Sequence, residues 1–234
     1  TKGLSIVDNE LTTLSDKIKN FLKKEGHSKI NISAIKGPCL AAGLANKMRT
    51  GPVIANQNIK ESQFLKDIIS TNYYSTEISE DITGVELSGA IKNIYSMLIG
   101  ASEGLSNSKA SKEIQSKYFL NTAASLIHRS ISEMEEFISY YGGKPETVYG
   151  LAGLGDLYVS AIGGRNSLMG KYLGEGYLYT DVKERFMKDI TVEGAQLALE
   201  IGPRILEDLN SKNFPLMFSI LKTICENKKL QIEW

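Results

Sequence analysis

The chain has 234 residues, 42% of them hydrophobic, and its 27 basic and 27 acidic side chains give a formal net charge of zero. This length allows one large or two modest domains with a well-buried core. The balanced charge predicts no nucleic-acid binding, and the composition is typical of a soluble cytoplasmic protein. The apolar runs are too short for a membrane span, and two distant cysteines with two histidines predict no metal site.

The first 80 or so residues predict alternating helices and strands, the order that is typical of an α/β domain. The turn between the first strand and the helix after it, Lys36-Gly37-Pro38-Cys39, should present backbone N–H groups to a ligand. Apolar spacing and the glycine and proline positions predict helices over 8–25, 40–48 and 60–70, and strands over 30–35, 52–55 and 73–78.

From Gly84 onward the apolar pattern is almost wholly helical, so we place a domain boundary near 81–84 and expect a helical bundle after it. Glycine and proline positions mark where its helices begin and end. The predicted features are a helix over 84–100, a helix that contains 131–141 and stops at Gly142-Gly143, an N-cap at Thr191 for a helix that ends near Gly202, and helix starts at Pro145, Pro203 and Pro215.

Lys92 lies in the middle of the apolar, small-residue helix predicted over 84–100. Ser88, Lys92, Ser96 and Gly100 are four residues apart, so they share a narrow face with room for another chain segment or a ligand. A desolvated lysine is tuned toward accepting a proton near neutral pH. The alternative is a lysine that extends into water, and the helix taken alone favours that alternative.

Two glycine-rich segments follow in the helical part. Leu151 to Asp156 reads LAGLGD, and 163–167 reads GGRNS at the start of a predicted helix. Glycines, a helix N-terminus and an arginine fork together suit a phosphate group. An ordinary Gly-Gly turn with a solvated arginine explains the second segment equally well, and a lone Asp156 is commonly a helix cap or an ion-pair partner.

Several motifs, in order, resemble those of the NAD(P)-dependent glycerol-3-phosphate dehydrogenases: GVELSGAIKN, LAGLGDL, GGRN and VEG. Thr1-Lys2-Gly3 is similar to the family's TKG motif, and 37–41 is similar to its SGPSFA segment with Cys39 in place of serine. The resemblance implies two domains. Residues 1–83 would be the C-terminal part of a Rossmann-type dinucleotide-binding α/β domain, and 84–234 an all-α, 6-phosphogluconate-dehydrogenase-like domain for substrate binding and catalysis.

The resemblance also implies roles for individual residues. Lys92 would take the proton from the substrate hydroxyl, with Lys2 and Asp156 as the other catalytic residues and Asp156 orienting the lysine. The implied substrate-binding residues are Lys2, Gly37, Cys39, Lys92, Asp156, Ser160, Arg165 and Asn166. The implied cofactor-binding residues for NAD or NADP are Lys2, Ala41, Arg165 and Glu193. The substrate would be glycerol 3-phosphate or dihydroxyacetone phosphate, and the family leads us to expect a homodimer.

The sequence departs from this family at its start, because it contains no GxGxxG turn and its first residue is Thr1. We therefore expect a processed chain or a fragment that binds no NAD(H) by itself. Two alternatives stay open. One is another β-hydroxyacid-type dehydrogenase, which the GGRN segment disfavours, and the other is a non-catalytic helical binding or scaffold protein.

Overall fold

The computed structural model describes residues 3–109 and 115–233, and the chain divides into two compact units. Unit 1 comprises Thr1–Ala90 and Met134–Asp156, and unit 2 comprises Ile91–Glu133 and Leu157–Trp234. Two long helices contribute residues to both units, α4 (Ile82–Lys109) and α5 (Gln115–Tyr140). Each unit is described by itself below.

Unit 1 begins with a β-hairpin where the sequence predicts a helix. Strand β1 (Leu4–Val7) pairs antiparallel with β2 (Glu10–Thr13), and Asp8 and Asn9 between them have φ of 50° and 66°. Two consecutive positive φ angles are typical of a type I′ hairpin turn, which aspartate and asparagine tolerate. The predicted helix over 8–25 is therefore wrong in its first part, and α1 (Leu14–Lys24) begins only after Thr13 caps it.

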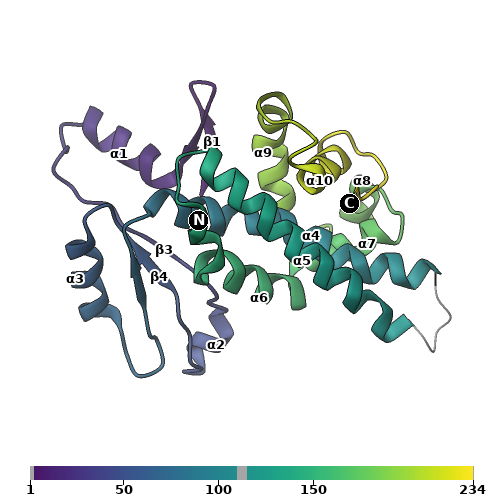
Figure 1. The fold of residues 1–234 in the computed structure, drawn as a ribbon, viewed down its shortest axis with the longest axis horizontal. Coiled ribbons are helices and arrows are strands. Elements are labelled where there is room, and N and C mark those ends of the chain that lie inside the picture. The colour runs from purple at the N-terminus through teal and green to yellow at the C-terminus, as the bar shows by residue number, and fades with distance from the viewer. Residues whose placement is uncertain (1–2, 110–114, 234) are drawn as a thin grey trace. The chain divides into compact units, whose positions relative to one another are not determined.

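The second sheet of unit 1 has the strand order β3-β4-β5, and Figure 1 labels β3 and β4. Strand β3 (Ala34–Lys36) is antiparallel to β4 (Val53–Ala55), which is parallel to β5 (Glu77–Ser79). The predicted strands over 30–35 and 73–78 are therefore too long at their N-terminal ends. Their partner β4 spans only three residues, and before Glu77 the pairing continues only as an isolated parallel bridge between Thr50 and Tyr74.

Two helices connect these strands. Helix α3 (Ile59–Ile69) links β4 to β5 and packs on both, close to the predicted helix over 60–70. Helix α2 (Ala41–Ala45) follows β3 and is shorter than the predicted helix over 40–48. It ends early because Lys47 has a φ of 54°, which is outside the helical region.

After α5, the Gly142-Gly143 stop is confirmed: Gly142 has a φ of 83° and Gly143 N–H donates to the Ile138 carbonyl at 2.9 Å. A 3₁₀ turn, η1 (Pro145–Tyr149), and a π-helical turn, η2 (Leu151–Gly155), complete unit 1. The shorter helices that follow are α6 (Asp156–Ile162), α7 (Arg165–Gly174), α8 (Tyr179–Arg185), α9 (Glu193–Asp208) and α10 (Pro215–Cys225).

Proline positions in unit 2 were only partly predictive. Pro215 opens α10 as expected, but Pro203 lies inside α9, so the predicted helix start there is wrong. A proline in a helix costs one backbone hydrogen bond. Here Ile201 and Ile205 on either side are fully buried, and α9 packs along α10 (Figure 1), so tertiary packing keeps the helix continuous. The observed N-cap of α9 is Val192, one residue after the predicted Thr191.

Helices α4 and α7 approach each other closely within unit 2. A Cβ atom on Gly170 would lie only 1.8 Å from the Met97 carbonyl oxygen, and one on Gly100 would lie 2.2 Å from the Ser167 carbonyl oxygen. Each helix therefore needs glycine where it meets the backbone of the other. The small-residue face predicted on α4 thus receives another segment of the chain, α7.

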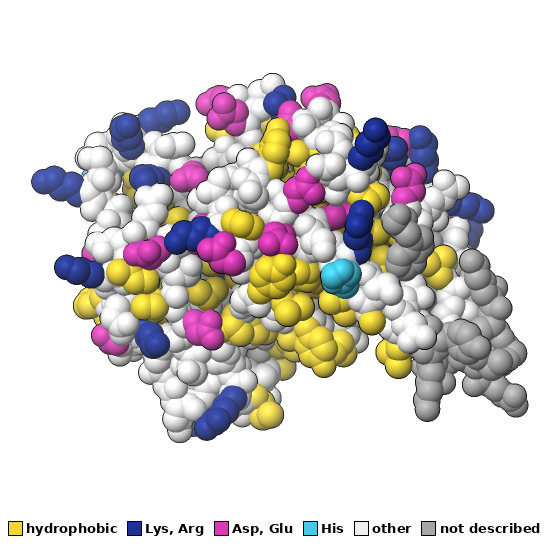
Figure 2. Space-filling view, in the orientation of Figure 1, with side chains coloured by type: hydrophobic (Ala, Val, Ile, Leu, Met, Phe, Trp, Pro, Cys, Tyr) yellow, Lys and Arg dark blue, Asp and Glu magenta, His cyan; other side chains and the backbone are white. Residues whose placement is uncertain are grey.

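The described surface carries mixed charges. In the face drawn in Figure 2, basic and acidic side chains are interspersed among the coloured residues rather than separated by sign. Among the described residues, no helix is both long enough and apolar enough to cross a membrane.

Candidate functional site

Lys92 is buried in α4, with 8% of its surface exposed. Its Nζ donates a hydrogen bond to Ser160 Oγ on α6 at 2.6 Å. The side chain therefore does not extend into bulk water. The alternative that the helix alone favoured, a lysine that extends into water, is wrong. The structure brings together two of the predicted substrate-binding residues, which are 68 positions apart in the sequence.

Asn166, in the first turn of α7, connects three segments of unit 2. Its Nδ2 donates to Asn93 Oδ1 at 3.0 Å, and its Oδ1 accepts the Gly194 N–H at 2.8 Å. Asn166 is 6% exposed, so its amide is held in one orientation. The sequence analysis did not predict Asn93 as a site residue. Its place directly after Lys92 in the GAIKN motif is the signal that could have identified it.

Arg165 and Glu193 are the first residues of their helices, α7 and α9, and their side chains form an ion pair through Arg165 Nη2 and Glu193 Oε1. The arginine side chain is 55% exposed and the glutamate 13%. Gly164 caps α7, so the segment 163–167 starts a helix as the sequence predicts, and a Cβ atom on Gly163 would meet no heavy atom within 4 Å. There is therefore open space beside Gly163, directly before this helix N-terminus.

Four of the predicted site residues that the structure describes belong to unit 1. Gly37 has a φ of 133°, and a Cβ atom there would lie 2.9 Å from Pro52 Cα, so only glycine fits this turn. Cys39 and Ala41 are exposed, with Ala41 starting α2. Asp156 is half-buried at the junction of η2 and α6. The remaining predicted residue, Lys2, lies outside the described part of the chain.

The start of the lysine-bearing helix is anchored within unit 1 by Asp81. This buried carboxylate accepts the Gly84 N–H at 2.9 Å through Oδ1, and the Lys144 N–H at 2.9 Å and the Thr147 hydroxyl at 2.6 Å through Oδ2. It thus caps α4 and fixes the segment after α5 to the same point.

A second buried carboxylate, Glu133, lies in unit 2. It accepts the Leu216 and Met217 N–H groups at 2.8 and 2.9 Å, which cap α10, and the Tyr95 hydroxyl at 3.1 Å. Burial raises the pKa of Glu133 to about 7, although these hydrogen bonds and nearby Arg129 act to lower the pKa. Tyr95 is on α4, so this group fixes both α10 and the second half of α4.

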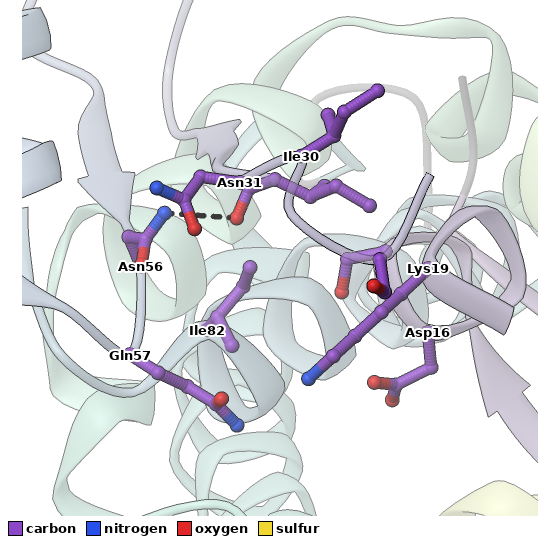
Figure 3. Close-up of a pocket in the computed structure, with 10 residues that line it drawn as sticks. Asp16, Lys19, Ile30, Asn31, Asn56, Gln57 and Ile82 are labelled. Atoms are coloured by element: carbon purple, nitrogen blue, oxygen red, sulfur yellow. Dashed lines mark hydrogen bonds between the residues drawn. The ribbon is translucent and has the colours of Figure 1, made fainter. Parts of the chain in front are cut away.

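A cavity of about 120 Å³ lies in unit 1 (Figure 3). Figure 3 shows Asp16 and Lys19 of α1 on one side and Asn56 and Gln57 on the other, and Asn56 Nδ2 donates to the Ile32 carbonyl at 2.9 Å. None of the predicted site residues in the described part of the chain lines it. Within the described ranges, no group of three or more His, Cys, Asp or Glu side chains is placed to hold a metal ion.

Comparison with known proteins agrees with the motifs. The family model described as "NAD-dependent glycerol-3-phosphate dehydrogenase C-terminus" matches residues 81–233. The NADP(+)-dependent glycerol-3-phosphate dehydrogenase of Archaeoglobus fulgidus is 31% identical over 236 residues, covering 99% of this chain and 66% of that protein. A glycerol-3-phosphate dehydrogenase [NAD(P)+] of Coxiella burnetii is 38% identical over 152 residues, 63% of this chain and 42% of that protein.

Solved structures show the same likeness. The crystal structure of a Coxiella burnetii glycerol-3-phosphate dehydrogenase has a TM-score of 0.76 at 27% identity, covering 99% of this chain and 65% of that one. The enzyme from Saccharomyces cerevisiae has a TM-score of 0.80 at 19% identity, covering 98% and 64%, and shows the fold alone. The chain thus spans less than two thirds of the length of these relatives.

The order of the motifs and the likeness in fold place the chain among proteins that are named as dehydrogenases. Within that class it belongs to the NAD-dependent glycerol-3-phosphate dehydrogenase family, because the family model matches more than half of its length. The match covers the C-terminal helical domain of that family, and close relatives are named as enzymes that use NAD(P)+.

Proposed function

We propose that this chain supplies the substrate-binding and proton-transferring part of an enzyme that interconverts glycerol 3-phosphate and dihydroxyacetone phosphate with NAD(P)(H). The observation that carries this proposal is the buried Lys92, hydrogen bonded to Ser160 at 2.6 Å, in the same unit as the Arg165 and Asn166 pair that suits a phosphate. A buried amine beside a hydroxyl is suited to proton transfer to and from a substrate oxygen.

In oxidation, the hydroxyl proton at carbon 2 of the substrate passes to Lys92 Nζ as the C–H bond breaks and the C–O bond becomes a carbonyl. The nicotinamide ring, when bound, supplies the hydride acceptor. In reduction Lys92 returns the proton to the oxygen. Ser160 holds the amine in place, and Lys2 and Asp156 complete the proton-transfer group by the family resemblance.

Arg165 binds the substrate phosphate in this proposal, and the family resemblance implies that its guanidinium also contacts the cofactor. The fork is 55% exposed and the glycine turn before it is open, so the residues fit an incoming anion. Asn166 has both ends of its amide engaged, which supports a role in holding Gly194 and Asn93 in position around the phosphate site. Gly37 and Cys39 complete the substrate contacts, and Ala41 and Glu193 the cofactor contacts.

We further propose that residues 1–83 form the C-terminal part of a Rossmann-type domain and 84–234 the helical domain. The parallel pair β4 and β5, joined by α3, supports this, because a strand-helix-strand unit is the building block of such domains. A cytoplasmic homodimer rests on the resemblance alone, and light scattering of the purified full-length protein would test its mass.

The experiment that tests the proposed reaction is an assay of the full-length protein that contains this chain. We expect glycerol 3-phosphate to drive formation of NADH or NADPH, followed by absorbance, and dihydroxyacetone phosphate to drive the reverse. Turnover of 3-hydroxyisobutyrate without turnover of glycerol 3-phosphate would replace this proposal by a β-hydroxyacid dehydrogenase.

A further inference from the structure

Another cavity of unit 1, of about 500 Å³, is lined by residues of the two segments that precede β4 and β5, by Glu77 at the start of β5 and by Leu151 of η2. Its volume falls within the ~300–1,000 Å³ that is usual for small-molecule sites. Within the described ranges, none of the predicted site residues lines it. The cavity is therefore a candidate site for a ligand that the proposed reaction does not use.

Backbone hydrogen bonds fix the walls of this cavity. The Thr50 N–H donates to the Tyr73 carbonyl at 2.8 Å, and the Ser75 N–H donates to the Thr50 carbonyl at 2.9 Å. Thr71 closes the loop, because its N–H donates to the Tyr74 carbonyl at 2.9 Å and its Oγ1 accepts the Tyr74 N–H at 3.0 Å. The shape of the cavity is thus set by the backbone, and a preformed site loses little conformational entropy when a ligand binds.

Four exposed polar side chains line the cavity and make no hydrogen bond or ion pair with any residue that the structure describes: Arg49, Asn72, Ser75 and Glu77. Arg49 is also the one arginine in the sequence of unit 1. A guanidinium group has five N–H donors in a planar fork that matches the oxygens of a phosphate group. The cavity therefore offers a phosphate a cation that no carboxylate of the described chain already pairs.

The two charges of the cavity lie at opposite ends of it. Thr50 pairs with Tyr74 and Val53 pairs with Glu77, both in parallel, so the register puts Arg49 level with residue 73, four residues before Glu77. Four residues of extended chain span about 13 Å. A carboxylate repels a phosphate but accepts hydrogen bonds from hydroxyl groups. The arrangement thus suits a ligand with an anionic group at one end and hydroxyl groups at the other.

We propose that this cavity is a binding site for a phosphorylated monosaccharide. Its phosphate binds Arg49, its ring contacts the half-buried Tyr73 between the two ends, and its hydroxyl groups donate to Glu77. Inorganic phosphate would leave Glu77 without a partner, and a neutral sugar would leave Arg49 without one, so neither matches the cavity as well. The binding is independent of the proposed reaction, because none of these three residues takes part in that reaction.

The experiment is a calorimetric titration of the full-length protein with glucose 6-phosphate. We expect Arg49→Met, which removes the charge and keeps an unbranched side chain, to weaken binding by roughly tenfold or more. Arg49→Lys keeps the charge but loses the fork and should weaken binding by only about threefold. Lys60→Met removes an exposed lysine of the same unit and should change nothing. Equal affinity of Arg49→Met and the wild type would overturn the proposal, as would a wild type that does not bind the probe.

A variant of unit 2 separates this cavity from the phosphate site proposed at Arg165. Arg165→Ala should change the affinity for glucose 6-phosphate by less than about twofold, because substitutions at independent sites do not affect one another. Loss of binding in Arg165→Ala, with normal binding in Arg49→Met, would assign the sugar phosphate to the other site and contradict the proposal.

Glu77→Gln tests the class of ligand. It should weaken binding of glucose 6-phosphate by about fivefold, because a carboxylate accepts hydroxyl groups more strongly than an amide does. Binding of inorganic phosphate should stay the same or become tighter, since a repelling charge is removed. If inorganic phosphate binds the wild type as tightly as glucose 6-phosphate, the cavity is a site for simple anions and the assignment to a sugar phosphate is wrong. Circular dichroism checks the fold, and Arg49→Gln replaces Arg49→Met if that variant does not fold.

Discussion

The two units differ in how they hold the residues that the sequence predicts at the site. In unit 2 these side chains are paired or packed: Lys92 with Ser160, Asn166 with Asn93, and Arg165 with Glu193. In unit 1, Cys39 and Ala41 lie exposed in and after a glycine turn. Preorganised groups contribute most to binding and catalysis, so unit 2 should be far more sensitive to substitution than the turn of unit 1.

The largest effect should come from Lys92→Ala in the full-length protein. Loss of a positioned proton-transfer group should lower kcat about a thousandfold, because general acid–base catalysis contributes on the order of 10²- to 10⁴-fold. Steady-state kinetics measure kcat, and circular dichroism checks that the variant folds. Lys188→Ala, which removes an exposed lysine, is the control and should leave kcat unchanged. Near-normal turnover of Lys92→Ala would remove the lysine from the mechanism.

Gly170→Ala should destabilise the protein by about 3 kcal/mol, the upper end for an overpacked core. The new Cβ atom would lie 1.8 Å from the Met97 carbonyl oxygen, and that backbone atom cannot move without shifting α4. Gly163→Ala is the matched control, since nothing lies within 4 Å of its Cβ position. Urea unfolding measures both variants, and equal midpoints would contradict the close packing of α4 and α7.

Glu133 should make stability depend on pH. Its pKa is raised from 4.5 to about 7, so between these values the folded protein keeps a proton that the unfolded chain releases. Stability should therefore fall as pH rises from about 4.5 to about 7, by up to roughly 3 kcal/mol, and then level off.

Glu133→Gln is expected to remove this decline, whereas exposed Glu200→Gln should preserve it. Urea midpoints across the pH range provide the measurement. An identical pH dependence in Glu133→Gln and the wild type would mean that another group causes the decline.

Arg165→Ala should raise KM for glycerol 3-phosphate about thirtyfold, because a charged hydrogen bond contributes about 1.5–3 kcal/mol. The expected change in kcat is smaller. Arg185→Ala, an exposed arginine of the same unit, serves as the control. If KM stays within twofold of the wild-type value, the phosphate must bind elsewhere.

The smallest effect should come from unit 1. Cys39→Ser replaces an exposed thiol, a weak hydrogen-bond donor, by a hydroxyl and should lower KM by less than about threefold. A tenfold change in KM for glycerol 3-phosphate would contradict the expected difference between the units, because the exposed turn would then be as sensitive to substitution as unit 2.

Much of the helical part was predictable because its signals are local. Real helix ends are marked by the apolar spacing, by Gly142-Gly143, and by Pro145 and Pro215. The order of the short motifs indicated the family. Lys92 itself could be selected only by resemblance, since its own helix favoured a solvated lysine. The hairpin at 4–13 was missed because the Asp8-Asn9 turn lies within a run whose apolar spacing also fits a helix.

The sequence by itself determined that the chain after Gly84 is mainly helical, that Gly142-Gly143 ends one of its helices, and which residue types are available for phosphate and proton transfer. Only the tertiary structure decided how those residues are used. Burial of Lys92 beside Ser160, continuity of α9 through Pro203 and the pairing of Thr50 with Tyr74 all depend on contacts between segments distant in the chain. Such contacts leave no periodic pattern in the local sequence, because they are set by which surfaces pack together.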